Sequence, residues 1–298
     1  MPVAMAYVSD QHEDAKGEKL GWFSTATLCG RFLAPLSGGA ILGLIGLNGG
    51  RAYQGVYLVC LVAGVLALAA SFRVQADEGT HQVNSNWRES IGSLGQLAST
   101  SRLLTIGAVE AAVLFMYGTI EVFLPLYALQ QKVSTLEIGG LLSAQIITLA
   151  VTKPATGKLS DRHGRIPQIV WGSALGVVAV VALVFCTGFL AFLIVSILIG
   201  LSLSLVTSAT SAAVAEISRC ENRGSAMGIF GTIMDVGHSA GPLVSGIVVA
   251  WFGFKVSFVF AALVIGLATT AFCITEAFGK KIACPVDEHI IGETLSIN

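Results

Sequence analysis

Eight long apolar stretches with very few charged residues follow one another along this chain of 298 residues. A helix needs about 20 mostly apolar residues to cross the hydrocarbon core of a bilayer, and each stretch has roughly that length or more. The stretches span residues 18–46, 53–73, 103–129, 137–156, 167–187, 189–215, 224–251 and 257–277. Because each is continuously apolar and does not alternate as the strands of a membrane barrel do, the sequence predicts an all-α integral membrane protein.

The composition argues against several classes of function. Only 12% of the residues are charged, against about 25% in an ordinary soluble domain, so polar surface is too scarce to cover a water-soluble globule. The net charge of −1 gives no reason to expect a nucleic-acid partner. The sequence contains no CxxC pair, no metal-ligand spacing, no GxxxxGK nucleotide loop and no nucleophile constellation. We therefore predict no metal, no cofactor and no enzymatic activity.

The lysines and arginines of the connecting segments gather on one side of the predicted membrane. If alternate loops lie on opposite faces, twelve of these basic residues fall on one face and three on the other. The positive-inside rule then assigns to the cytoplasm the segments 9–17, 74–102, 157–166, 216–223 and the tail from Gly279. We therefore expect a multi-pass protein of the plasma (cytoplasmic) membrane, with the lipid bilayer as its first partner.

An internal repeat relates two distant parts of the chain. Residues 16–39 align with residues 223–246 at a constant offset of 207. Parallel repeats of this kind relate the two halves of a transporter about an axis along the membrane normal. Six spans follow the segment 74–102 but only two whole spans precede it, so a complete first half would need at least about 105 residues before Met1. We expect an N-terminally truncated chain with about 8 complete transmembrane helices out of about 12, and a missing N-terminal half as a candidate partner.

The same count predicts the domain organisation. We expect the remainder of an N-terminal bundle at 1–73, a cytoplasmic linker at 74–102, a C-terminal six-helix bundle at 103–278 and a cytoplasmic tail at 279–298. The linker contains acidic, asparagine and serine residues, as expected of a solvated segment between two bundles.

A loop with the sequence GKLSDRHGR lies between two predicted spans on the basic side. Gly157 and Gly164 permit close packing and a sharp turn, and Arg162 and Arg165 suit a position among anionic lipid headgroups. These residues belong to the pattern G-x-L-x-D-R-x-G-R, whose aspartate is Asp161.

This loop resembles a cytoplasmic loop of the major facilitator superfamily, and within that family the chain looks most like the drug and proton antiporters. The resemblance implies two six-helix bundles around a central cavity. It also implies that Asp161 is a conformational switch that engages the positive start of a helix in the other bundle, here Gly17 to Gly21. The alternative is a loop anchor without a gating role. Ile166 departs from the family, which often has another basic residue there.

Two copies of a glycine motif extend the resemblance. The pattern G-x8-G-x3-G-P-x2-G-G, associated in the family with antiporters, occurs with one replacement per copy at Gly21, Gly30, Ala34, Pro35, Gly38, Gly39 and at Gly228, Gly237, Gly241, Pro242, Ser245, Gly246. Gly30, Ala34 and Gly38 recur every fourth residue, so we expect them to form a small-residue face for a neighbouring helix. Both prolines are expected to bend their helices. Antiport is implied, and tight packing without a role in coupling is the alternative.

Ionisable residues at membrane depth are the candidates for a transport pathway, because each costs at least about 2.5 kcal/mol to insert. Glu110 and Glu121 are separated by about 1,100° of helix, so we expect them on one face of the span 103–129. By resemblance this span lines the translocation path. Glu110 is the leading candidate for proton carriage or cation recognition, with a structural ion pair as the alternative. Glu121, nearer the outer interface, is a second candidate or simply hydrated.

The span 224–251 contributes Asp235 and His238, one helical turn apart, which could titrate as a coupled pair. The alternative for His238 is a structural residue beside the bend. Arg31 occupies the equivalent position in the repeat, where it could bind substrate, pair with an acid or cap carbonyls released at Pro35. Gln145 could add polarity to the cavity. A run of hydroxyl residues could do the same or bond to its own helix: Ser202, Ser204, Thr207, Ser208, Thr210 and Ser211.

These features together predict a secondary active transporter that exports a small organic compound in exchange for protons by alternating access. Its predicted partners are the bilayer, a small-molecule substrate and protons. The alternative is a truncated or split membrane protein that does not transport and needs a partner half.

Overall fold

The computed structural model describes residues 30–43, 50–72, 101–217 and 223–278. These residues form helices and no strand, which confirms the all-α prediction for the described part of the chain. The seven helices there are 30–43, α3 (Gly50–Ser71), α5 (Ser101–Gln130), α6 (Thr135–His163), α7 (Arg165–Leu183), α8 (Phe189–Ile217) and α9 (Arg223–Phe278). Five of them, α5 to α9, are long and apolar enough to cross a membrane.

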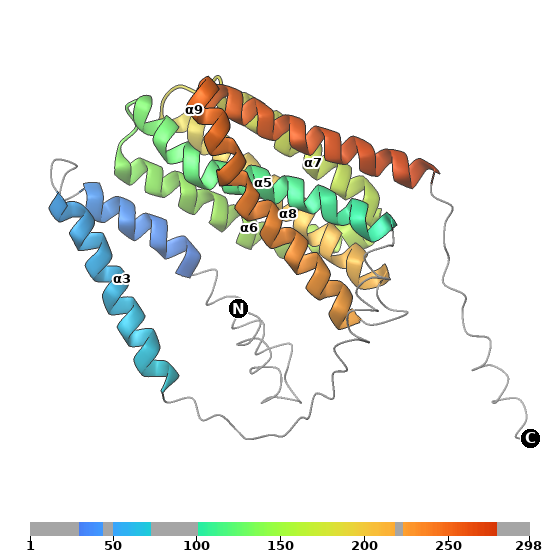
Figure 1. Cartoon of the computed structure of the whole chain (residues 1–298), viewed down its shortest axis with the longest axis horizontal. Coiled ribbons are helices and arrows are strands. Elements are labelled where there is room, and N and C mark those ends of the chain that lie inside the picture. The colour runs from blue at the N-terminus through green and yellow to red at the C-terminus, as the bar shows by residue number, and fades with distance from the viewer. Residues whose placement is uncertain (1–29, 44–49, 73–100, 218–222, 279–298) are drawn as a thin grey trace, which may run out of the picture.

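The two spans predicted at 224–251 and 257–277 are two helical arms within α9 that meet at a kink. The kink lies at Gly253, whose φ of 82° falls in the left-handed region that favours glycine. Figure 1 shows the two arms of α9 forming a V, with the turn at the upper left. A single glycine therefore replaces the connecting loop expected between these spans.

The ends of α6 follow from local sequence. Ser134 and Glu137 form a capping box, in which the Ser134 Oγ accepts from the Glu137 N–H at 3.3 Å and the Glu137 carboxylate accepts from the Ser134 N–H at 2.8 Å. At the other end Gly164 has a φ of 90° and separates α6 from α7. The segment 157–166, predicted as a loop, is therefore helical except at Gly164, because the positive φ of this one residue is enough to end α6 and begin α7.

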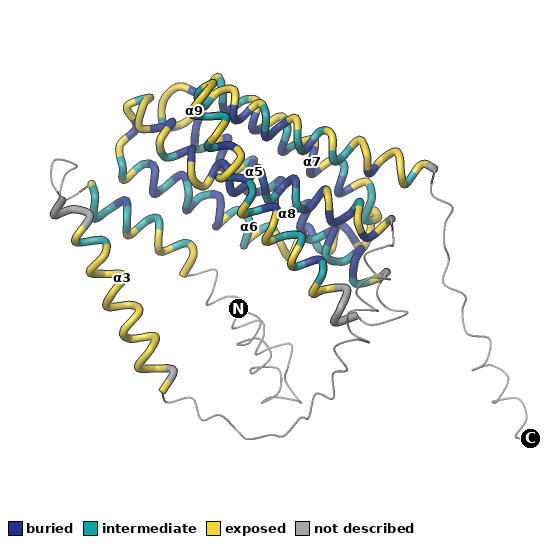
Figure 2. The backbone as a smooth tube through the Cα atoms, in the orientation of Figure 1, coloured by how far each residue is buried: buried dark blue, intermediate teal, exposed yellow. Residues whose placement is uncertain are grey.

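Helices α5 to α9 share one core, and α5 runs through its middle. Figure 2 shows the buried residues concentrated on these helices, whereas α3 is exposed along its length. Tyr127 of α5 packs edge-on against Phe192 of α8 and Phe258 of α9, with ring centroids 5.8 and 5.5 Å apart. Helix α5 is thus packed against both α8 and α9.

Candidate functional site

A cavity of about 210 Å³ lies where the helix 30–43 meets α5 and α6. Its lining consists of Arg31, Ala34, Pro35, Tyr117, Glu121, Leu142, Gln145 and Ile146. Arg31, Glu121 and Gln145 were predicted separately as pathway residues, and three different helices bring them to this one cavity. Glu110 and Asp235 do not belong to the lining.

His238 of α9 interacts with the cavity residues of α5. Its Nε2 atom lies 3.0 Å from Oε2 of Glu121, and its ring stacks on Tyr117 with centroids 5.7 Å apart. Arg31 approaches the Tyr117 hydroxyl from the helix 30–43. The two basic residues that the repeat makes equivalent therefore meet the same two side chains of α5.

The predicted pairing of His238 with Asp235 is not the arrangement seen. Asp235 is exposed, and among the described residues the acidic partner of His238 is Glu121. The reason is that His238 finds a partner on α5, whereas Asp235 lies on the exposed side of α9.

Gln145 is 2% exposed, and its Nε2 amide has no hydrogen-bond partner among the described residues. A buried donor that lacks an acceptor carries a free-energy cost of about 1–3 kcal/mol. Since this amide lines the cavity, an acceptor placed there would remove the cost. Gln145 is thus a candidate binding group of the site.

Glu110 lies on α5 in a different environment from Glu121. Its side chain is fully buried, and Oε2 accepts a hydrogen bond of 2.8 Å from the Thr210 hydroxyl of α8. Oε1 has no hydrogen-bond partner, and the ion pairs among the described residues do not include Glu110. Lys153 of α6 is nevertheless near enough to act electrostatically on this carboxyl group, so the structural ion pair stays an alternative.

The hydroxyl run on α8 mostly joins helices. Ser202 donates to the Gly172 carbonyl of α7 at 2.7 Å, and the Ser204 hydroxyl lies 3.0 Å from that of Thr156 on α6. Gln168 of α7 donates to the Ser208 hydroxyl at 3.0 Å. These bonds join α8 to α6 and α7, and no residue of α8 belongs to the lining of the cavity.

The second glycine motif packs α9 against α5. A Cβ atom on Gly237 would lie 2.5 Å from the Ala111 carbonyl oxygen, and one on Gly241 would overlap the Phe115 carbonyl oxygen. Ser245, the replacement in this copy, has its hydroxyl 2.8 Å from that of Thr119 on α5. Gly246 faces Phe123, and Gly228 has open space.

The first copy packs against α6, but through a different face from the one predicted. Added Cβ atoms at Gly30 and Gly38 would meet nothing within 4 Å among the described residues. Instead a Cβ on Gly39 would lie 2.7 Å from the Thr135 carbonyl oxygen, and one on Gly139 2.6 Å from that of Pro35. The helix contacts α6 through Pro35 and Gly39 and not through Ala34 and Gly38. Both pairs have the same spacing of four residues, so the spacing alone does not distinguish the two faces. Gly21 lies outside the described residues.

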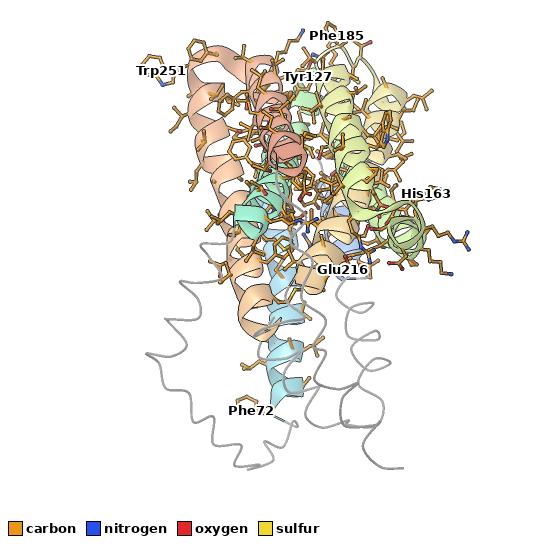
Figure 3. The ribbon with its side chains drawn as sticks, turned by 90° about the vertical axis from the view of Figure 1, so that its right-hand side faces the viewer. Phe72, Tyr127, His163, Phe185, Glu216 and Trp251 are labelled. Atoms are coloured by element: carbon orange, nitrogen blue, oxygen red, sulfur yellow. The ribbon has the colours of Figure 1, made fainter. Side chains whose placement is uncertain are left out.

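The loop motif joins the ends of three helices through Arg165. Its guanidinium lies 2.7 Å from the Asp161 carboxylate of α6 and 2.8 Å from Glu216 of α8. Figure 3 shows Glu216 and His163 toward one end of the helices, away from Tyr127 at the other. Glu216 was not among the predicted site residues, although an acid at the end of a span beside a basic segment is a usable signal. The partner predicted for Asp161, Gly17 to Gly21, lies outside the described residues.

Replacing Gly164 with alanine is expected to destabilise the protein by about 1–3 kcal/mol, because its backbone conformation is nearly restricted to glycine. Gly157→Ala is the matched control, since Gly157 is helical and a Cβ there meets open space. Thermal unfolding of the purified protein in detergent measures both. Equal melting temperatures for the two variants would contradict the strained turn.

Comparisons with known proteins agree with these features. The Major Facilitator Superfamily model matches residues 1–144 and 111–281. An uncharacterized MFS-type transporter of Methanocaldococcus jannaschii is 31% identical over 143 residues, which cover 48% of this chain and 37% of that protein. Multidrug resistance protein 2 of Bacillus subtilis is 28% identical over 174 residues, covering 58% of this chain and 43% of that protein.

A multi-drug resistance efflux pump of Streptococcus pneumoniae is 24% identical over 208 residues, covering 68% of this chain and 50% of that protein. The chain thus spans half or less of the length of these relatives. The match to the family model nevertheless extends over most of this chain. With its apolar helices and repeated motifs, the chain belongs to the Major Facilitator Superfamily.

Proposed function

We propose that the protein is a secondary active transporter that exports a small organic compound in exchange for protons by alternating access. The observation that carries this proposal is Glu110, fully buried with one carboxyl oxygen unpartnered and one bonded to Thr210. An ionised carboxylate is costly away from water and cations, whereas a carboxyl group that holds a proton is not. Glu110 must therefore reach water to release a proton, which requires a change of conformation.

The substrate is proposed to bind in the cavity between the helix 30–43, α5 and α6. Support comes from Arg31, Glu121 and Gln145, which line this cavity at the junction of both glycine-motif helices with α5 and α6. The efflux pumps among the relatives favour export over uptake.

The proposed arrangement in the membrane follows the distribution of basic residues. We propose that the linker 74–102 and the tail 279–298 lie in the cytoplasm and that residues 103–278 form the C-terminal bundle. Arg165 and Glu216 then belong to the cytoplasmic end.

Proteoliposomes with an imposed proton gradient test the proposal. The full chain is reconstituted with a pH-sensitive dye inside, and ethidium, chloramphenicol and benzoate are added as cationic, neutral and anionic probes. The expected result is that at least one probe moves protons faster than in protein-free liposomes. Equal rates for every probe, together with no uptake of the probes themselves, would count against transport.

A second candidate function is a non-transporting membrane protein that needs a partner half. It is supported by α3, whose large apolar side chains are widely exposed, with Tyr57 at 71%, Leu66 at 65% and Leu61 at 63%. Exposure on all sides suits lipid or further helices. If the purified chain fails to transport and a second polypeptide co-purifies with it from native membranes, this candidate is favoured.

A further inference from the structure

The cavity carries hydrogen-bond donors from three helices. Arg31 supplies a guanidinium, Tyr117 a hydroxyl and Gln145 an amide with its Nε2 buried and unpartnered. Guanidinium and amide N–H groups donate and never accept, so their natural ligand is an oxygen acceptor. A carboxylate matches a guanidinium best, because two parallel N–H···O bonds fit the planar fork.

The negative charge in the lining is already engaged. Glu121 is the acid of the lining, and its Oε2 atom is bonded to His238 of α9 at 3.0 Å. Among the described residues Arg31 takes part in no ion pair. Arg31 hydrogen-bonds to the Tyr117 hydroxyl and acts electrostatically on Glu121, and its five N–H groups leave donors beyond these contacts.

The remaining wall is apolar. Ala34, Pro35, Leu142 and Ile146 complete the lining. The volume of about 210 Å³ is below the roughly 300–1,000 Å³ of pockets that take drug-sized ligands. This space suits a molecule with one ring or a short chain, buried against Leu142 and Ile146.

The geometry points to a small organic monocarboxylate as the ligand of this cavity. Its carboxylate is bound by Arg31, with the Gln145 amide as a second donor, and its apolar body packs on the α6 wall. As a substrate assignment this rests on the proposed transport function, but binding itself does not require transport.

Equilibrium binding to the purified full chain in lipid nanodiscs tests the assignment. The probes are benzoate, benzamide and benzylammonium, which share a ring and differ in charge. Titration calorimetry is expected to detect benzoate binding, with the neutral and cationic probes at least about tenfold weaker, since the charge-assisted bond is lost. Benzylammonium binding as tightly as benzoate would overturn the assignment, and so would the absence of benzoate binding.

Substitutions at Arg31 and Gln145 test whether these two residues donate the hydrogen bonds to the carboxylate. Arg31→Gln is expected to weaken benzoate binding by more than about tenfold and Arg31→Lys by less, because lysine keeps the charge but loses the fork. Gln145→Leu is expected to weaken benzoate binding severalfold. Lys255→Gln, which removes an exposed cation outside the lining, is the control and leaves binding unchanged. Unchanged benzoate affinity in Arg31→Gln, at a wild-type melting temperature, refutes the site.

The two proposals fail separately. Benzoate binding without movement of any probe in proteoliposomes removes the transport function and keeps the site. Movement of ethidium or chloramphenicol without benzoate binding keeps the transport function and removes the carboxylate assignment.

Discussion

Replacement of Glu110 by glutamine is expected to reduce proton-driven transport to the level of protein-free liposomes while the protein stays folded. Glutamine has nearly the same shape and can still accept the hydrogen bond from Thr210, but it cannot carry a proton. Exchange of labelled for unlabelled substrate needs no proton movement, so it is expected to continue. Substrate-induced proton flux and counterflow in the same proteoliposomes measure the two activities.

Asp235→Asn is the matched control for Glu110→Gln, because it also neutralises a predicted pathway acid. Asp235 is exposed, so its replacement is expected to leave most of the proton flux intact. If Glu110→Gln couples protons as well as the wild type does, the buried carboxyl group has a structural role only. If Asp235→Asn alone loses coupling, the proton carrier is on α9.

Gly237→Ala is expected to destabilise the protein by about 1–3 kcal/mol or more, the range for overpacked cores. The added methyl group would lie 2.5 Å from the Ala111 carbonyl oxygen and 2.6 Å from the Ala111 Cα atom, and this backbone cannot rotate out of the way. The two helices must separate, which opens the seam between α5 and α9. Thermal unfolding in detergent and the fraction of monodisperse protein after purification measure the loss.

Gly228→Ala provides the control, because Gly228 belongs to the same motif but has open space around it. Alanine in the middle of a helix is favoured over glycine by about 0.5–1 kcal/mol, so this variant is expected to be slightly more stable than the wild type. A melting temperature of Gly237→Ala equal to that of Gly228→Ala would show that α5 and α9 do not approach this closely.

Helix positions were largely predictable from the sequence. The apolar stretch 103–129 became α5 (Ser101–Gln130), and 189–215 became α8 (Phe189–Ile217), because length and hydropathy are dictated by the bilayer. The division of α9 was less accurate. Gly253 turns the helix through backbone dihedral angles alone, whereas hydropathy indicates a loop of several residues.

Contacts between helices were less predictable. Arg31 and Gln145 could be singled out as polar residues at membrane depth, but their common cavity follows from how the helix 30–43 packs on α6. Tyr117 was not among the predicted site residues, because nothing in the sequence of α5 marks this tyrosine as a neighbour of His238. Small or glycine-rich positions recur every fourth residue both from Ala34 and from Pro35. Which of these two faces of the helix packs on α6 depends on the shape of α6, and the spacing does not reveal it.

Both arms of α9 pack against α5. Its first arm is locked to α5 at Gly237, and its second arm reaches Phe115 of α5 through Phe260, with rings 6.1 Å apart. Because each arm has its own contact with α5, the two arms of α9 and α5 form one packed unit. The contact of Gly39 with Gly139, where the helix 30–43 meets α6, is made by backbone atoms and glycines, so a sliding movement of that helix on α6 meets no interlocked side chains at this point.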